Sequence, residues 1–414
     1  MSKVLFLGIP SHGHVNPTIG LVSELVNQGE EVIYFCSEEF KEKIEKTGAL
    51  YKSYIEDLNI FKKKQDSPKF ENVGGPINSM QGVIKSSEKI IEDILFQTRG
   101  IKFDYMIYSA AFPFADVMTQ ILKIPTVCSL AVFAGLKGFF DRGKKTNNNH
   151  FKIDPELIKT YGEVCASINK TYSIKMPENI MGLLSNKGDI NLVYTSKYFI
   201  SQSDLEYFDD SYRFVGPPVY DRKENLDFPF EKLEGKKVIY ISLGTIFGSY
   251  DLELYNLFFK SFEDFDGVIV MAAYNVDLSQ FDIPNNFIVR NYVPQSELLK
   301  YTDAAITHAG MNSISDLVYN NIPFVALPIG ADQPALAKRA EELGAAISLD
   351  VTKLNIEVLR ASVEKVLSDS SYLKNLKKIS DSFKESGGYK KAVKEIFEIS
   401  HYSVSKRICD IFST

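Results

Sequence analysis

Short runs of mostly apolar residues recur along the chain, and glycine, proline or polar residues bound each of them. Runs of this length are typical of strands buried on both faces, as in a parallel sheet. They lie at residues 4–7, 31–36, 105–108, 126–130, 238–241, 267–272, 304–306 and 323–327. Helical stretches separate these runs, so the pattern predicts an α/β architecture.

Helix start and stop signals mark the connections between the runs. Asn16 is the expected N-cap of a first helix, with Pro17 at its first position and Gly29 beyond its end. Further helices are expected at residues 79–98, 314–319 and 333–343, and a last one after Gly388. Alternation of strand and helix with short loops predicts parallel, doubly wound sheets with right-handed crossovers.

The length of the chain, 414 residues, exceeds what a single hydrophobic core usually serves. Residues 214–218, followed by the charged stretch 221–234, are typical of an interdomain linker. We therefore expect an N-terminal Rossmann-like domain at 1–217, a linker at 218–236, and a C-terminal Rossmann-like domain at 237–386. A terminal helical segment at 387–414 should follow.

Composition narrows the class of protein. A hydrophobic content of 45% and a charged content of 24% are those of a soluble globular enzyme. The net charge of −6 argues against nucleic acid or an anionic membrane as a partner. No stretch is long and apolar enough to span a membrane or to serve as the apolar core of a signal peptide, so we expect a cytoplasmic protein.

The cysteines do not indicate a metal site or a disulfide framework. None of the four forms a C-x-x-C or Cys/His pattern, and they lie far apart, at Cys36, Cys128, Cys165 and Cys409. Buried free thiols are the simplest interpretation.

The turn at residues 307–313 (THAGMNS) carries the first indication of chemistry. A glycine between a strand end and a helix start lets backbone N–H groups and the positive end of the helix dipole converge on an anion. His308, Asn312 and Ser313 add side-chain donors at that point. The alternative is an ordinary strand–helix turn in which glycine and serine only cap the helix.

The wider segment, residues 291–333, resembles the donor-binding signature of family 1 glycosyltransferases. These are nucleotide-sugar-dependent enzymes of the GT-B fold, with two Rossmann-like domains facing each other across a cleft and a C-terminal helix that crosses back to the first domain. The matching residues are Tyr292, Pro294, Gln295, His308, Gly310, Asn312, Ser313, Pro323, Pro328, Asp332 and Gln333. Tyr292 stands where the family usually has tryptophan, and Asp316 where it has glutamate.

A second motif, GHVNP at residues 13–17, resembles the N-terminal motif of the same family, most closely its bacterial macrolide-modifying branch. The first turn lacks G-x-G-x-x-G, which disfavours dinucleotide binding. Sugar-nucleotide epimerases share the two-domain architecture, but they are not expected to carry both motifs.

The resemblance assigns donor-binding roles. Tyr292 should stack on the base, whose edge the Val293 backbone and the Gln295 side chain should bind, and Asp316 should accept ribose hydroxyls. The diphosphate should lie against residues of two glycine turns, namely His308, Gly310, Asn312 and Ser313 of one and Ser242, Gly244 and Thr245 of the other. Asp332 and Gln333 should bond the sugar hydroxyls. Because these donors meet the diphosphate, no metal or other cofactor is implied.

His14 occupies the position of the catalytic base in the resemblance, with His12 as the competing candidate. The family orients this histidine with the second carboxylate of a D-x-x-x-x-D pattern. Here the pattern begins at Asp104 but ends at Ser109, a hydroxyl that hydrogen-bonds an imidazole yet offers it no charge. Asp116 is the alternative carboxylate.

Aromatic residues in the loops after the N-domain strands are more often core than pocket, but some should line an apolar acceptor cleft: Phe112, Phe133 and Phe139.

The expected activity is transfer of a hexose, glucose first, from a UDP-sugar to a hydroxyl of an apolar small molecule with inversion. The acceptor is expected to be phenolic, flavonoid-like or macrolide-like, and dTDP remains open as the nucleotide. The chain should act as a monomer or weak dimer. Because Ser109 replaces a carboxylate, a non-catalytic helper that binds a partner enzyme is the alternative.

Overall fold

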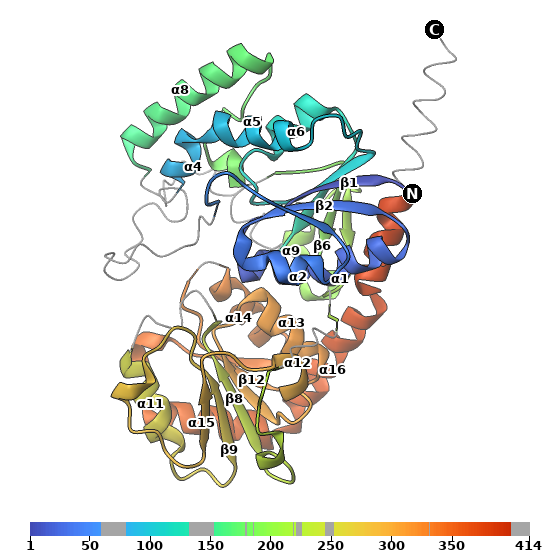
Figure 1. The fold of residues 1–414 in the computed structure, drawn as a ribbon. Coiled ribbons are helices and arrows are strands. Elements are labelled where there is room, and N and C mark those ends of the chain that lie inside the picture. Colours follow the sequence, from blue (N-terminus) through green and yellow to red (C-terminus); the bar gives the residue numbers. More distant parts are fainter. Residues whose placement is uncertain are drawn as a thin grey trace.

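The protein is described here from a computed structural model, in which two parallel sheets form separate halves of the molecule (Figure 1). It describes residues 1–58, 80–131, 153–178, 180–184, 186–217, 219–220, 226–244, 252–330 and 332–398. Three predicted site residues lie outside the described residues: Phe133, Phe139 and Thr245.

The first sheet has seven parallel strands in the order β3-β2-β1-β4-β5-β6-β7. They are β1 (Lys3–Leu7), β2 (Glu31–Cys36), β3 (Leu50–Ser53), β4 (Tyr105–Ser109), β5 (Thr126–Leu130), β6 (Ile190–Val193) and β7 (Tyr212–Phe214). Its helices are α1 (His12–Asn27), α2 (Lys41–Glu45), α4 (Gln81–Lys85), α5 (Ser87–Gln97), α6 (Ala115–Leu122), α8 (Pro155–Tyr172) and α9 (Gln202–Leu205).

The second sheet has six parallel strands in the order β10-β9-β8-β11-β12-β13. They are β8 (Val238–Ser242), β9 (Val268–Ala272), β10 (Phe287–Arg290), β11 (Ala304–Thr307), β12 (Phe324–Ala326) and β13 (Ala346–Ser348). Its helices are α11 (Leu252–Phe262), α12 (Gln295–Leu298), α13 (Met311–Tyr319), α14 (Gln333–Glu342), α15 (Ile356–Ser368) and α16 (Ser370–Glu385).

Both sheets are doubly wound, as predicted, and in each the strand order reverses at one point, between β1 and β4 and between β8 and β11. The crevice beyond the carboxyl ends of the strands at such a point is where open α/β sheets bind ligands. In Figure 1 the two halves lie one above the other, with α1 and α2 of the first facing α13 and α14 of the second. The predicted boundaries at residues 217 and 236 stay predictions; β7 ends at Phe214 and β8 begins at Val238.

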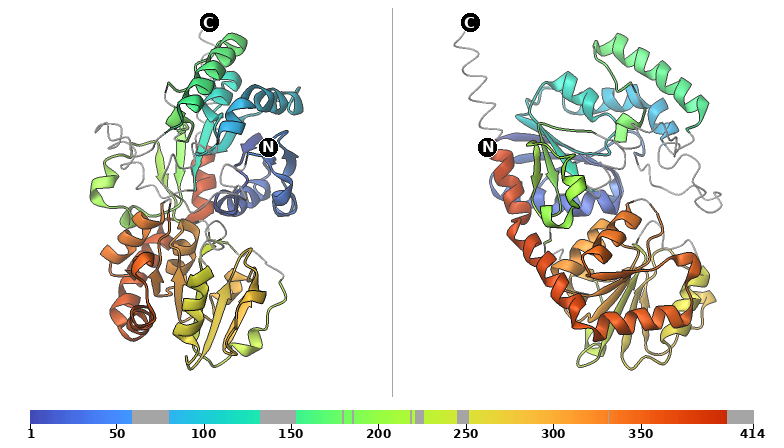
Figure 2. Two further views of the ribbon diagram at one scale, coloured as in Figure 1. Left: turned by 90° about the vertical axis from the view of Figure 1, so that its left-hand side faces the viewer. Right: turned by 180° about the vertical axis from the view of Figure 1, so that it is seen from behind.

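The chain crosses between the halves twice. After α16, Gly387 and Gly388 adopt positive φ angles of 89° and 62°, and the backbone N–H of Gly388 donates to the carbonyl of Val215. Residues 388–398 are then helical, and Ala392, Val393 and Ile396 pack in the same core cluster as β1 and α1. Figure 2 shows this helical segment running along the first half, which confirms the predicted return.

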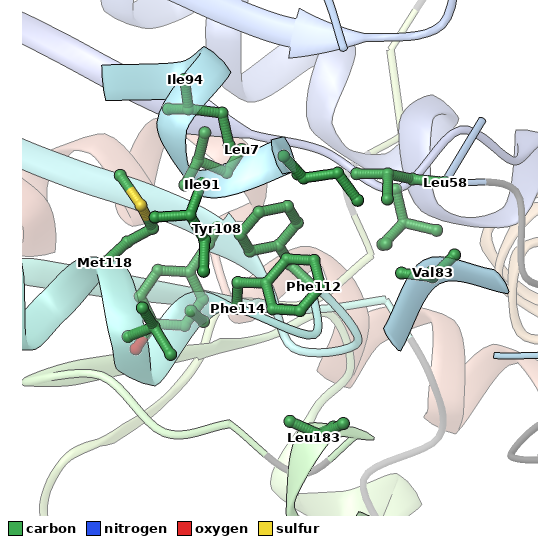
Figure 3. Close-up of a cluster of buried hydrophobic side chains, with 14 of the residues drawn as sticks. Leu7, Leu58, Val83, Ile91, Ile94, Tyr108, Phe112, Phe114, Met118 and Leu183 are labelled. Carbon is green, nitrogen blue, oxygen red and sulfur yellow. The ribbon is translucent and has the colours of Figure 1, made fainter. Parts of the chain in front are cut away.

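Apolar side chains fill both faces of each sheet, and the face of the first sheet under α4, α5, α6 and α8 is shown in Figure 3. Phe112 is fully buried there, edge-on to Phe114 and stacked on Tyr54. The expectation that Phe112 lines an open acceptor cleft is therefore wrong for this structure. The ring lies inward because the β4–α6 turn folds back onto the sheet, where burying an aromatic side chain is most favourable.

The first helix also differs from the expectation. It begins at His12 rather than after Asn16, and Pro17 lies inside it. A proline in a helix removes the N–H that would donate four residues back, here to the Gly13 carbonyl. Among the described residues, no helix is long and apolar enough to cross a membrane.

Candidate active site

The carboxyl ends of β1 and β4 bring together the predicted base and its predicted partner. β1 and β4 are adjacent parallel strands, with Leu7 paired to Tyr108. His14 lies in the first turn of α1, just beyond β1, and Ser109 is the last residue of β4. The Nδ1 atom of His14 lies 2.9 Å from Oγ of Ser109, and both side chains are buried.

Burial dominates the electrostatics of His14. Removing the imidazole from water disfavours its charged form and lowers the pKa of His14 from its ordinary 6.5 to about 4. The ring is therefore neutral at physiological pH.

The competing residues are occupied elsewhere. His12 Nε2 lies 3.4 Å from Glu39 Oε1, and its ring packs edge-on to Phe40 and, across the two halves, to Tyr274. Asp116 Oδ2 accepts a hydrogen bond of 2.9 Å from Gln120 on its own helix. The structure thus places Ser109 in hydrogen-bonding contact with the His14 ring.

The turn carrying His14 meets the turn at residues 307–313 of the second half. Asn312 Nδ2 donates to the Gly13 carbonyl at 3.3 Å, and α1 contacts α13. That carbonyl is available because Pro17, four residues on, has no N–H to occupy it. The two predicted sites, one on each half, are therefore adjacent.

His308 lies between two glycines, and this explains both glycine turns. A Cβ atom at Gly310 would fall 2.5 Å from His308 Nε2, and one at Gly244 would fall 2.6 Å from the same atom. Only a residue without a side chain leaves room for the ring at either position. Gly244 also adopts a φ of +74°, in the left-handed region that favours glycine.

The environment of His308 suits a neutral hydrogen-bonding group. Part of the residue reaches solvent, but burial of its ring lowers the pKa of His308 to about 4. Its Nδ1 atom is buried without a hydrogen-bond partner, as is Oγ of Ser11 in the loop before α1. A buried polar atom left unsatisfied is a common sign of a ligand site.

The N-terminus of α13 supplies the remaining donors. Gly310 is its N-cap residue and has no side chain to occupy the first free N–H groups of the helix. Asn312 and Ser313 lie half-buried in its first turn. Free backbone N–H groups and a helix dipole at this position can hold a diphosphate without a cation.

A partly buried chain of hydrogen bonds, which we call the Tyr240 relay, links three side chains beneath this turn. The Tyr240 hydroxyl donates to Gln295 Oε1 at 3.0 Å, and Gln295 Nε2 donates to Asp316 Oδ2 at 2.6 Å. Asp316 is 6% exposed. The tyrosine contact fixes which end of the amide faces the carboxylate. The sequence predicted Gln295 and Asp316 but missed Tyr240, whose signal is its position two residues before Ser242 on one face of β8.

The remaining donor-site residues occupy loops at the same edge. Tyr292 and Val293 lie between β10 and α12, with Val293 buried and Tyr292 half-buried. Asp332 is the N-cap residue of α14, although its side chain does not cap the helix. Gln333 Oε1 accepts from the backbone N–H groups of Ile329 and Gly330.

A cavity of about 660 Å³ lies away from these residues. It opens beside the crossing segments, where Ser196, Arg213, Phe214, Ser382 and Lys391 line it. Two of these residues form a hydrogen bond between the halves, with 2.8 Å between Ser196 Oγ and Ser382 Oγ. The cavity therefore belongs to the connection between the halves.

Comparison with known proteins agrees with this geometry. The profile of the family described as "UDP-glucoronosyl and UDP-glucosyl transferase" matches residues 231–387. The Bacillus subtilis (strain 168) protein named "Uncharacterized UDP-glucosyltransferase YdhE" is 33% identical over 96% of this chain and 98% of its own length. The "NDP-glycosyltransferase YjiC" of the same organism is 30% identical, covering 95% and 96%.

Solved structures show the same fold. The glycosyltransferase of kitacinnamycin superposes with a TM-score of 0.80 at 22% identity, over 95% of this chain and 98% of the other. CalG4, the calicheamicin glycosyltransferase, gives 0.76 at 22% identity over 96% and 98%. The chain has the GT-B fold and belongs to the UDP-glucuronosyl and UDP-glucosyl transferase family, so it is a glycosyltransferase.

Proposed function

We propose that the protein transfers a hexose, glucose first, from a UDP-sugar to a hydroxyl of an apolar small molecule, with inversion at the anomeric carbon. The observation that carries the proposal is the buried His14–Ser109 contact of 2.9 Å, one residue from the Gly13 carbonyl that Asn312 binds. A base and a diphosphate site so placed can act on opposite sides of one anomeric carbon.

The donor is proposed from the relatives and from the α13 turn. Relatives at 33% and 31% identity over 96% of the chain are named UDP-glucosyltransferases. His308, Asn312, Ser313 and the free N–H groups of α13 would stabilise the negative charge of the departing UDP. Gln295 and Asp316 would hold the ribose, and Asp332 and Gln333 the sugar.

The acceptor class is proposed from more distant relatives. They include an oleandomycin glycosyltransferase at 22% identity and a sterol 3-beta-glucosyltransferase at 24%, whose names state large apolar acceptors. A phenolic, flavonoid-like or macrolide-like acceptor would place its hydroxyl at Nε2 of the His14 ring. That nitrogen would take the proton as the hydroxyl oxygen attacks.

The test is an acceptor screen with UDP-glucose, in which mass spectrometry detects hexose addition and NMR determines the anomeric configuration of the product. Formation of the β-glucoside from the α-linked donor is expected. If UDP binds but no acceptor is glycosylated with any UDP-hexose, the protein is a non-catalytic helper instead.

We also propose that transfer needs no divalent cation, because neutral donors and a helix terminus meet the diphosphate. Turnover in EDTA should equal turnover in magnesium. A complete loss in EDTA that magnesium reverses would contradict this.

The proposed setting is the cytoplasm, with the chain a monomer or weak dimer. Cys36, Cys128 and Cys165 carry free thiols, and the first two are buried, which fits a reducing compartment. Light scattering over a range of concentrations tests the assembly state.

A further inference from the structure

The loop after β6 leaves the first sheet and packs into the second half. Ser196 caps the short 3-10 helix Lys197–Phe199, and its Oγ accepts from the Phe199 backbone N–H at 3.3 Å. Phe199 is fully buried in the apolar cluster that includes β8 and α13, and its ring packs edge-on to Phe383 of α16. Residues 196–200, which we call the docking segment, are therefore a part of the first half that completes the core of the second.

Arg339, in the last turn of α14, binds the end of the docking segment. Its Nε donates to the Phe199 carbonyl at 2.9 Å, and its Nη2 donates to the carbonyls of Tyr198 and Ile200 at 3.2 and 3.3 Å. A guanidinium presents its N–H donors in a rigid planar fork, so one side chain can bind three successive carbonyls. The side chain is only 18% exposed, which shields these charge-assisted hydrogen bonds from water.

The opposite end of α14 lies at the proposed sugar site. Asp332 is the N-cap residue of the helix and Gln333 is its first residue. Arg339 lies roughly 9 Å further along the axis, at about 1.5 Å per residue. The face of α14 between these ends is fully buried against the second half, through Leu336 and Ala337. The helix therefore connects the docking segment rigidly to the residues proposed to bind the sugar.

A second contact between the halves lies on a different strand of the first sheet. Asn312 of α13 donates to the Gly13 carbonyl, beyond the end of β1, whereas the docking segment follows β6. Strands β4 and β5 separate β1 from β6. At about 4.8 Å between neighbouring strands, β1 and β6 are roughly 14 Å apart. Two contacts on strands this far apart oppose a rotation of one half against the other more strongly than either contact alone.

We propose that Arg339 is a positioning residue for transfer, which keeps the first half in the orientation that brings an acceptor hydroxyl to the sugar. The inference rests on the proposed function, because that function assigns the sugar to the start of α14 and the acceptor to the first half. Loss of Arg339 should lower turnover and leave the affinity for UDP unchanged, since the groups proposed to bind UDP all belong to the second half.

The experiment compares the full-length parent with Arg339→Met, by calorimetry with UDP and by steady-state kinetics with UDP-glucose and 2-naphthol. Methionine keeps an apolar stem but donates no hydrogen bond. We expect the Kd for UDP to stay within about twofold of the parent and kcat to fall by roughly tenfold or more, because a small misplacement of reacting groups is costly. An unchanged kcat would overturn the proposal. A loss of UDP affinity as large as the loss of kcat would also overturn it, since Arg339 would then support the nucleotide site itself.

Arg360→Met is the matched control. Arg360 of α15 also binds backbone carbonyls at the end of a helix, those of Lys260 and Ser261 in α11, but both helices belong to the second half. The control should keep kcat within about twofold of the parent even if its melting temperature falls. An equal loss of kcat in Arg360→Met and Arg339→Met would show a general effect of stability and would overturn the proposal.

Arg339→Lys is the conservative variant, and it tests the proposal even if Arg339→Met does not fold. An ammonium group is a point charge and cannot present a planar fork to three carbonyls. Its kcat should therefore lie between those of the parent and Arg339→Met, with a loss of roughly threefold or more. A kcat equal to that of the parent would overturn the proposed role of the guanidinium.

A further measurement does not depend on turnover. Small-angle X-ray scattering with saturating UDP compares the arrangement of the halves in the parent, Arg360→Met and Arg339→Met. We expect a larger radius of gyration in Arg339→Met alone. Identical scattering from all three proteins would overturn this inference. A parent that glycosylates no acceptor would overturn the proposed function, and the scattering would still decide whether Arg339 holds the two halves in place.

Discussion

The Tyr240 relay shows how a residue outside any recognised motif can determine the geometry of a site. The tyrosine hydroxyl orients the Gln295 amide, and the amide in turn holds the Asp316 carboxylate. Its effect on a ligand is indirect, through the position of those two groups. The hydroxyl alone can therefore be removed without touching a residue proposed to contact the nucleotide.

Tyr240→Phe should weaken UDP binding by roughly fivefold, since loss of one hydrogen bond is worth about 1 kcal/mol. The KM for the donor should rise while kcat changes little. Calorimetry with UDP checks this. The control is Tyr105→Phe, which loses a similar buried bond of 2.9 Å, to Glu30, at the start of β4. Equal UDP affinity in Tyr240→Phe and the parent would contradict the positioning role.

Gly310→Ala tests the packing of His308. The backbone at Gly310 has a φ of −65°, which any residue adopts, so the added methyl acts only by its approach of 2.5 Å to the His308 ring. We expect at least a tenfold loss of turnover with the fold retained. Gly162→Ala is the control, because a Cβ atom there meets nothing within 4 Å. Full activity in Gly310→Ala would show that the ring position is unimportant.

At this scale the sequence predicted which residues form the site better than it predicted which side chains contact one another. His14 and Ser109 were predicted as a pair from the resemblance to the family, and the structure brings them to 2.9 Å. Phe112 was misplaced because an aromatic residue after a strand has the same sequence signature in a core as in a pocket. Tyr240 was missed because a tyrosine in a buried strand resembles any other core residue.

Among the elements, α1 departs most from expectation. Asn16 and Pro17 form a typical helix start, yet the helix begins at His12 and includes both. A proline is compatible with a helix where the carbonyl that it leaves free finds another donor. Asn312 is that donor, and it belongs to the other half of the molecule, so no local pattern could have shown it.

Pro17→Ala restores an N–H that competes with Asn312 for the Gly13 carbonyl. The free energy of unfolding should stay equal or rise, while kcat/KM should fall by roughly three- to tenfold, because loss of one hydrogen bond is worth about 1 kcal/mol. Asn312→Ala removes the same contact from the other side. The two effects should not add in the double variant, as expected for residues that share one interaction. Strict additivity would mean that Pro17 acts elsewhere.

The central strands were easier to predict than the peripheral strands and the helix boundaries. The buried strands β1, β4, β8 and β11 gave continuous apolar runs that the sequence revealed directly. The short or peripheral strands β3, β7 and β13 carry too few apolar residues to stand out from loops. The observed helix boundaries differ from the predicted ones because capping depends on tertiary partners as well as on the local residues.

For the whole molecule, two histidines whose rings are buried couple stability to pH. His14 and His308 have folded pKa values of about 4, below the ordinary 6.5, so the unfolded chain binds more protons between these values. Stability is therefore highest above pH 6.5, falls as pH drops toward 4, and levels off below. At pH 5.5 the loss from His14 should be about 1 kcal/mol.

Urea unfolding at pH 7.5 and 5.5 measures this loss, and His14→Gln should lose about 1 kcal/mol less than the parent over that interval. Both proteins are unfolded in the absence of nucleotide sugar, so that ligand binding does not contribute to the difference. If the parent and His14→Gln show the same dependence on pH, the imidazole is not held neutral by burial.

Because the chain crosses between the halves twice, the first half cannot be exchanged between related proteins as one continuous segment. Residues 388–398 follow the second sheet in sequence but complete the core of the first, through Ala392, Val393 and Ile396. A single genetic crossover near residue 217 would therefore unite a first half with a foreign closing helix. Acceptor preference should therefore be transferred between relatives only in chimeras with two breakpoints. In such chimeras both segments of the first half come from the same parent. Chimeras with one and with two breakpoints, compared by melting temperature, test whether this inheritance is required.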